Sequence, residues 1–490
     1  MIRMKVKTLV LLLALVILLG WFGYAQTPSM LYKMEKYDTL LRWFPNDNLA
    51  ESALYESSAE AFDYSQGDDR LFIFPDRSSY GGGGNINKEK LPYAVQQLET
   101  LVNEYSTSQA INRTKFRLAS LYLWSMEWDK AEVLFKEIKG SGSSSVNDTE
   151  VEDYLTILAT RHQSSKQQPL VTGKVTIGGE PAPNVYVVLH GKDDNGWYSM
   201  PFGQYPIAIT DKDGSYRFYK ALPGEYQVGV GVTPEQVNGN YLGDQEKQYV
   251  KVKDGETDTY DLSFSTQVKV VSPINKELIT GDKLKFNWEA YPGASYYQLS
   301  ITDFMRDEND EIVGSQSYMM DKERWKGTSA EYTLDTLRQY LRGFGKSQGR
   351  EGSKVRLSTS GILGAVYPGG NFIWSVGAYD EDGKLISSSN GYYTLLNNTT
   401  PFFSIDDSGM LEGDKLVMQG DYEAAIRSYE AEGNNDYALR ALALMILNGF
   451  TWEDKGDPGK ALTYLRKIAK PSEYDKDLIK SAEDELEKQE

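Results

Sequence analysis

The stretch "TDKDGSYRFYKALPGEYQV", from Thr210 to Val228, has the pattern of two strands separated by turns. Tyr216 and Phe218 alternate with polar residues, and the same period of two resumes after the turn residues "LPGEY". The dipeptide Asp213-Gly214 favours a hairpin, because glycine accepts the positive φ that such a turn demands. The stretch therefore predicts antiparallel β structure in the middle of the chain.

The two aspartates beside Lys212 raise the alternative of a calcium loop. An EF-hand loop needs acidic ligands at positions one, three and five and a glutamate at position twelve. Counted from Asp211, position five is Ser215 and position twelve is Leu222. The ligand count predicts a turn, and the sequence as a whole predicts no metal site and no cofactor.

Length and composition are those of a folded multidomain protein. A chain of 490 residues is too long for one hydrophobic core, so about three or four domains are expected. Its 70 acidic and 52 basic residues give a formal charge of −18, which predicts no nucleic-acid partner. The chain has no cysteine, which excludes disulfides, thiolate metal sites and thiol catalysis.

The N-terminus, residues 1–29, has the pattern of an export signal or a membrane anchor. The basic start "MIRMKVK" precedes an uncharged apolar run over residues 8–25. The basic end stays in the cytoplasm while the apolar run enters the membrane. Two outcomes stay open: an uncleaved anchor that contacts the membrane through residues 8–25, or secretion after cleavage near Ala25. Either outcome places the remaining chain outside the cytoplasmic membrane.

Residues 30–165 have the period of helices. The stretch "KFRLASLYLWSMEWDKAEVLFKEI" has the spacing of a helix, a tight turn and a second helix. Small Ala119 and Ala131 let the two helices approach closely, and Tyr122 fills the gap between them. This stretch resembles a tetratricopeptide repeat.

The same pattern returns in residues 405–490. The stretches "GDKLVMQGDYEAAIRSYE" and "GDPGKALTYLRKIAKP" also resemble the tetratricopeptide repeat. Their helix-crossing residues Ala425 and Ala461 lie about one repeat period of 34 residues apart. The resemblance implies either a concave surface that binds peptides or an array that only holds neighbouring domains together.

Two β-sandwiches are predicted between the helical blocks. Residues 168–265 combine the patterns G-x-V, T-D-x-x-G-x-Y-x-F and P-G-x-Y-x-V, and they resemble the carboxypeptidase regulatory-like (transthyretin-like) sandwich. Residues 266–398 carry alternating strands around Trp288 and Trp374 and a turn at Asp382-Gly383. They resemble a fibronectin type III or immunoglobulin-like module with both tryptophans in its core.

A basic insertion at residues 335–366 interrupts the second module. Its cations recur at every fourth residue, and they are the candidate ligand-binding residues: Arg338, Arg342, Lys346, Arg350 and Lys354. Charge-assisted hydrogen bonds from such a loop would hold an anionic wall polymer or acidic lipid heads. The alternative is a solvated loop that pairs with acidic neighbours. Glycines in "RGFGKSQGREG" break any helix beyond about Arg342.

Catalytic motifs are absent from the sequence, which contains no H-E-x-x-H, G-x-S-x-G or G-x-x-x-x-G-K-[ST]. The sequence predicts a multidomain α+β protein, with helical-hairpin repeats at both ends and two central antiparallel β-sandwiches. The favoured hypothesis is a non-catalytic, exported binding or scaffold protein of a bacterial cell envelope. Its helical repeats would bind envelope proteins or peptides, and its sandwiches would act as spacers. Binding of a glycan or anionic wall polymer is the second hypothesis, and a cryptic hydrolase is the third.

Overall fold

The computed structural model of the chain describes residues 26–61, 70–81, 87, 89–141, 146–162, 167–194, 196, 205–307, 309, 311–320, 323–340, 343–348, 354–392 and 401–489. The predicted apolar run 8–25 lies outside these residues. Within the described ranges, no helix is both long and apolar enough to cross a membrane. The chain is a multidomain α+β structure with two compact units, Met1–Val237 with Gln245–Phe264 and Asn238–Asp244 with Ser265–Glu490.

The first unit combines helices with short strands. Its helical segments are α2 (Tyr37–Trp43), α3 (Ala50–Ser57), η1 (Ser58–Ala61), α4 (Leu91–Glu104), α5 (Ile111–Trp124), α6 (Trp128–Ser141), α7 (Asp148–Ala159) and α8 (Pro234–Val237). Its strands are β1 (Leu71–Ile73), β2 (Ser79–Gly81), β3 (Val171–Ile177), β4 (Glu180–Pro181), β5 (Tyr186–Gly191), β6 (Ile207–Ile209), β7 (Ser215–Phe218), β8 (Gly224–Val232), β10 (Val250–Val252), β11 (Asp258–Thr259) and β12 (Leu262–Thr266).

The strands of the first unit form two sheets. One has the order β2-β1-β8-β5-β6, with β10 also paired to β8, and the other is built around β3, which pairs with β4, β7, β11 and β12. Strand β3 runs antiparallel to β4 and β7 but parallel to β11 and β12. The predicted antiparallel sandwich therefore also contains parallel pairs.

The predicted turn at Asp213-Gly214 is present, but it does not form a hairpin, because β6 before it pairs with β5 while β7 after it pairs with β3 in the other sheet. Gly214 has φ +72°. One carboxylate oxygen of Asp211 accepts hydrogen bonds from the backbone N–H groups of Asp213 and Ser215, each at 3.0 Å. The other oxygen accepts from Arg217 at 3.0 Å. The Asp211 carboxylate thus shapes the turn that leads into β7.

Strands β1 and β2 come from the segment that was predicted to be part of the helical block 30–165. Strand β1 pairs antiparallel with β8, with Leu71 opposite Val232 and Ile73 opposite Val230. Phe72 and Phe74 are buried. A segment N-terminal to most of the helices therefore completes a sheet of the first sandwich.

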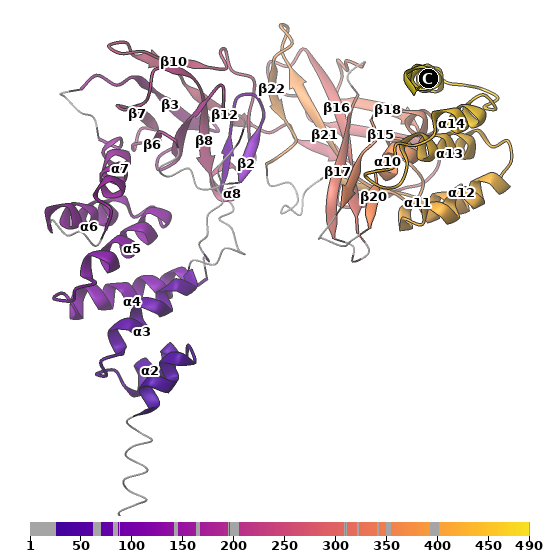
Figure 1. Ribbon diagram of the computed structural model, residues 1–490. Coiled ribbons are helices and arrows are strands. Elements are labelled where there is room, and N and C mark those ends of the chain that lie inside the picture. Colours follow the sequence, from indigo (N-terminus) through magenta and orange to yellow (C-terminus); the bar gives the residue numbers. More distant parts are fainter. Residues whose placement is uncertain are drawn as a thin grey trace, which may run out of the picture. The chain divides into compact units, whose positions relative to one another are not determined.

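Helices α4 to α7 follow one another as a stack and end beside the sheet that contains β6 (Figure 1). Leu98, Leu121 and Ala131 from the helices share one apolar core with Tyr186 and Val188 of β5. The helical block and the first sandwich therefore fold around common side chains.

The second unit also combines a sandwich with helices. Its strands are β9 (Asn240–Leu242), β13 (Val270–Ser272), β14 (Glu277–Ile279), β15 (Lys283–Trp288), β16 (Tyr296–Arg306), β17 (Ile312–Met319), β18 (Ser329–Thr333), β19 (Lys346–Gln348), β20 (Val355–Leu357), β21 (Asn371–Tyr379), β22 (Leu385–Ser388) and β23 (Phe402–Ile405). Its helices are α9 (Leu334–Gln339), α10 (Thr359–Leu363), α11 (Glu412–Gln419), α12 (Tyr422–Ala431), α13 (Asp436–Asn448), α14 (Pro458–Leu465) and α15 (Glu473–Gln489).

Two sheets of this unit enclose the predicted aromatic core. Their orders are β14-β23-β21-β16-β17 and β13-β15-β18. Trp288 and Trp374 are 3% and 0% exposed, which confirms both as core residues. Strand β23 lies beyond the predicted sandwich 266–398, yet it pairs antiparallel with β21 and parallel with β14.

Helices α11 to α14 lie beside α10 and the neighbouring strands (Figure 1). They form hairpins in which the predicted crossing residues Ala425 and Ala461 are both 0% exposed. Helix α11 passes close to α12, because a Cβ on Gly413 would lie 2.4 Å from the ring of Tyr429. The helix crossings therefore depend on small residues.

Replacing Ala425 with leucine tests this close packing. Ala425→Leu adds volume where no space is left, so we expect the free energy of unfolding to fall by about 1–3 kcal/mol. Ala431→Leu is the control, since Ala431 is exposed at the end of the same helix. Chemical denaturation measures both variants, and equal stability of the two would contradict the packing described here.

Candidate functional site

Arg338 is the first of the predicted basic residues, and it is buried. It lies in the last turn of α9 and is 8% exposed. Its Nη2 donates to Oδ2 of Asp414 at 3.2 Å, and its guanidinium lies 3.9 Å from the ring centroid of Tyr437. Asp414 also accepts from the Tyr429 hydroxyl at 2.6 Å. The charge of Arg338 therefore joins the insertion to α11, α12 and α13.

The other predicted cations do not continue a helix from Arg338. Helix α9 ends at Gln339, and the chain goes on to the hairpin β19–β20. The Lys346 ammonium donates to the carbonyls of Thr451 and Asp454 at 2.6 and 3.3 Å. Lys354 is exposed immediately before β20. Arg342 and Arg350 lie outside the described residues.

The face that α11 and α13 turn toward the sandwich is filled by the insertion itself. Helix α10 packs against both helices. Leu337 and Ile362 share an apolar core with Ala441 and Met445. The backbone N–H of Leu357 donates to the Tyr422 hydroxyl at 2.7 Å. The described side chains of the insertion therefore occupy this side of the helical block.

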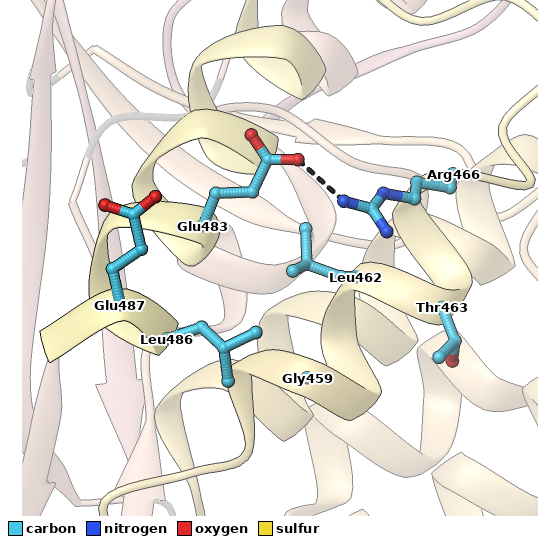
Figure 2. A pocket seen from close by; sticks show the side chains of 7 residues that line it. All are labelled: Gly459, Leu462, Thr463, Arg466, Glu483, Leu486 and Glu487. Carbon is cyan, nitrogen blue, oxygen red and sulfur yellow. Dashed lines mark hydrogen bonds and ion pairs between the residues drawn. The ribbon is translucent and has the colours of Figure 1, made fainter. Parts of the chain in front are cut away.

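A cleft of about 350 Å³ opens elsewhere, between α14 and α15. Figure 2 shows its side chains, which come from both helices. They are Gly459, Leu462, Thr463, Arg466, Glu483, Leu486 and Glu487. Arg466 donates to Glu483 at 2.7 Å across one end of the cleft. The lining combines an apolar floor of two leucines with a charged rim, which suits a partner side chain that is apolar and flanked by polar groups.

Local signals in the sequence position the two helices of the cleft. Helix α14 starts at Pro458 after the N-cap Asp457, whose carboxylate accepts from the Lys460 N–H at 2.8 Å. Helix α15 is held by a buried ion pair, in which Arg440 of α13 donates to both oxygens of Asp475 at 2.6 and 2.8 Å. Burial alone raises the pKa of the Asp475 carboxyl, but the bonds and charge of Arg440 together with bonds from Ser472 outweigh it, so that this pKa is lowered.

A second, smaller cleft of about 150 Å³ lies in the first unit, between α3, α4 and α5. Tyr55 forms part of its wall, with the guanidinium groups of Arg113 and Arg117 at 4.9 and 3.7 Å from its ring centroid. Glu51 and Glu56 also line it. Both charge signs meet in this small space, so no ligand class is favoured there.

The surroundings of the buried Asp303 carboxyl indicate whether this acid has a catalytic or a structural role. Asp303 is 2% exposed. Its oxygens accept from the Tyr367 hydroxyl at 3.0 Å and from the Ser360 N–H at 3.1 Å. Burial raises the pKa of Asp303. Since its partners are the first turn of α10 and a core tyrosine, this carboxyl has a structural role. Among the described residues, no group of three or more His, Asp or Glu is arranged to hold a metal ion.

Comparisons with known proteins do not assign the chain to a family. No family model and no curated protein matches it. Among solved structures, the chain is similar to DUF3823 family proteins from Bacteroides ovatus (12% identity, 48% of this chain, 99% of that chain, TM-score 0.15) and Parabacteroides merdae (12%, 48%, 97%, 0.16). It is also similar to the chicken CNTN1 FN1-FN3 domains (11% identity, 44% of this chain, 61% of that chain, TM-score 0.12). TM-scores this low do not define a common fold.

Removing the buried charge of Asp475 is expected to release α15. Asp475→Asn leaves Arg440 without its counterion, and breaking a buried pair in this way costs about 3–5 kcal/mol. Limited proteolysis should then cut residues 473–489 faster than in the wild type. Asp477→Asn, at an exposed position of the same helix, is the control. Because the folded pKa of Asp475 is lowered, its stabilisation is present above the unfolded carboxyl pKa and is lost as pH falls through the folded pKa. Equal protection in both variants at neutral pH would contradict an anchoring role.

Asp303 is expected to have the opposite pH dependence. Its folded pKa is raised, so the fold is penalised once pH exceeds the unfolded carboxyl pKa of about 4, and the penalty is complete above the folded pKa. In Asp303→Asn this loss of stability should be missing, so the difference in unfolding midpoint between variant and wild type should shift in favour of the variant as pH rises from about 4 to about 8. Thermal unfolding at a series of pH values measures it. A constant difference across that range would show that Asp303 has the same pKa in both states.

Proposed function

We propose that the protein is a non-catalytic, exported binding or scaffold protein of a bacterial cell envelope. The basic start and apolar run of residues 1–29 support export, with the mature chain anchored in the membrane or secreted. In this proposal the helices bind protein partners, and the two sandwiches act as spacers.

The buried residues of the helix hairpins support the tetratricopeptide-like part of the proposal. The positions that resemble the repeat are those that pack where paired helices cross. They are Ala119, Tyr122, Ala131, Phe135, Ala425, Tyr429 and Ala461, which are all buried. The sheets around β3 and β16 are likewise compatible with a carboxypeptidase regulatory-like module and a fibronectin type III or immunoglobulin-like module.

The α14–α15 cleft is the observation that carries a binding role. Helix faces that adjoin the sandwiches are already covered by apolar side chains of the same chain. The cleft, by contrast, is lined by helices alone and combines apolar and charged side chains. A partner peptide would place an apolar side chain over Leu462 and Leu486, with a cation near Glu487.

The partners of the buried ionisable groups support a non-catalytic role. Arg338 is paired with Asp414 and Arg440 with Asp475, and both pairs link one helix to another element. Asp303 receives hydrogen bonds from the fold. Groups held in this way stabilise an arrangement of elements rather than a transition state.

Cross-linking of envelope proteins to the purified chain tests the proposed binding role. The double variant Leu486→Ala, Glu487→Lys removes apolar contact and reverses one charge in the cleft, so at least one cross-linked envelope protein should be lost. Asp484→Lys makes a similar charge change at an exposed residue that does not line the cleft, and it should keep that protein. A cross-linking pattern unchanged in the double variant would overturn the role of the cleft.

A further inference from the structure

Met30 and Met34 form an exposed apolar face on the first described helix of the chain. Residues 26–33 are helical, and the Met34 N–H donates to the Met30 carbonyl at 3.0 Å, so the two side chains lie one turn apart. Each of them is 57% exposed. Lys33 is exposed beside them, because residues three and four apart share one side of a helix. Two thioether side chains and one cation therefore project from the same side.

Another side of this helix is packed against the protein. Leu31 and Tyr32 contact a small core that contains Leu40 of α2 and Ala50 and Ala53 of α3. These contacts hold the helix in one orientation on α2 and α3. The outward position of the two methionines is therefore a property of the fold.

The apolar run 8–25 ends immediately before this helix in the sequence. In a membrane-anchored chain, residue 26 starts at the edge of the hydrocarbon, and the headgroup layer beyond that edge is about 5–8 Å thick. A helix rises about 1.5 Å per residue, so Met30 is at most about 8 Å from the edge and Met34 at most about 14 Å, whatever the tilt of the helix. Because helical side chains lean toward the N-terminus, the Met34 thioether covers the turn before its own Cα. Both thioethers are therefore within reach of the headgroup layer.

This position suits the chemistry of the three side chains. Apolar side chains gain free energy when they leave water for the boundary between headgroups and acyl chains, and a lysine ammonium beside them binds lipid phosphate. We propose that Met30, Met34 and Lys33 form a second contact with the bilayer, in which the methionines enter the headgroup layer and the Lys33 ammonium pairs with lipid phosphate. This inference rests on the proposed function, in the form in which residues 8–25 stay in the membrane as an anchor.

A protein partner fits this surface less well than a bilayer. A stable protein interface buries about 800 Å² on each partner and has anchors in well-packed pockets. Here two flexible side chains project from the convex surface of one helix. A bilayer contact needs less area, because the anchor keeps these residues at a high local concentration beside the lipid.

The contact restricts how the first unit turns on its anchor. Since the helix over residues 26–33 shares a core with α2 and α3, lipid that holds Met30 and Met34 also holds those helices. A flexible linker after the anchor would leave the unit free to turn.

Methionine oxidation tests the contact in the unmodified chain. The full chain is inserted into phosphatidylcholine vesicles and treated with chloramine-T, a charged oxidant that stays in water, and mass spectrometry measures the sulfoxide at each methionine. Met319 and Met418, which are 46% and 37% exposed in the second unit, are the internal references. Exposure in the folded chain alone would make Met30 and Met34 the faster pair. We expect lipid to reverse this order, so that Met30 and Met34 are oxidised at least about threefold more slowly than the references.

The same measurement tests the role of Lys33. Lys33→Glu places a carboxylate beside lipid phosphate, so oxidation of Met30 should become at least about twofold faster. Lys212→Glu makes the same change at an exposed lysine elsewhere in the first unit and should leave that rate unchanged. Unchanged unfolding midpoints would show that both variants fold.

Spin labels distinguish lipid from a protein partner. The chain has no cysteine, so Met30→Cys, Met34→Cys and Val133→Cys each carry a single nitroxide label. Val133 is the control, since it is 55% exposed on α6 of the same unit. Oxygen dissolves in lipid and a nickel chelate stays in water, so electron paramagnetic resonance with both reagents reports the surroundings of each label. We expect the labels at both methionine positions to be open to oxygen and closed to nickel, and the label at Val133 to be open to nickel.

Two results would overturn the bilayer contact in a chain that sediments with the vesicles. One is oxidation of Met30 and Met34 at least as fast as that of Met319. The other is labels at both methionine positions that are open to nickel, or closed to both reagents as in a contact with protein. Either result would leave the anchor of the proposed function in place, whereas a chain that does not sediment with the vesicles would overturn the anchor as well.

Discussion

Strand β5 is apolar on both faces, and the first unit depends on covering both of them. Its residues Tyr186 to His190 are all buried. Because side chains alternate along a strand, Val187 and Leu189 point to one face while Tyr186 and Val188 point to the other. Tyr186 and Val188 share a core with the helices, so α5 and α6 cover the face that an isolated sandwich would expose to water. Each such side chain contributes about 1.5–3 kcal/mol when it is fully buried. The helices therefore serve to bury one face of β5. A partner would bind at helix surfaces that do not pack against this strand.

In the second unit, helices also pack against a sandwich, but buried ion pairs as well as apolar contacts hold them there. Its helices pack on α10 and on the side chains of the insertion, and two buried ion pairs fix where they lie. Such a pair adds little net stability compared with apolar residues of similar size, but an unpaired member is strongly unfavourable. Arg338 and Asp414 thus select one placement of α11 relative to α9 from the many that apolar packing alone would tolerate. At Arg338, the basic insertion therefore fixes the position of a helix.

Features that depend on neighbouring residues were predictable from the sequence, and features that depend on distant pairing were not. Asp213-Gly214 specifies its turn locally. The crossing alanines follow a helical period that is visible within the short stretch of sequence around each of them. Strands β1 and β23 are only three and four residues long, too short for a clear period, and each pairs with a strand far away or outside its predicted domain. The spacing of the basic residues suggested a helical face, but the glycines end that regularity and the structure makes a hairpin. The hydrogen bond from Trp452 to Gln348 spans more than a hundred residues, so no local pattern predicts it.

The same reasoning explains why a few cations can matter on so acidic a protein. At physiological ionic strength, charges more than about 8 Å apart are largely screened, so the net charge of −18 does not decide what happens at one surface. An exposed lysine therefore selects a ligand only where another interaction holds that ligand in contact. In the insertion, the Lys346 ammonium donates to the carbonyls of Thr451 and Asp454, so its contacts are with the protein itself. Arg338 pairs with Asp414, and Lys346 joins the hairpin β19–β20 to the segment between α13 and α14, so these two cations act on the arrangement of the chain at short range, where screening does not cancel them.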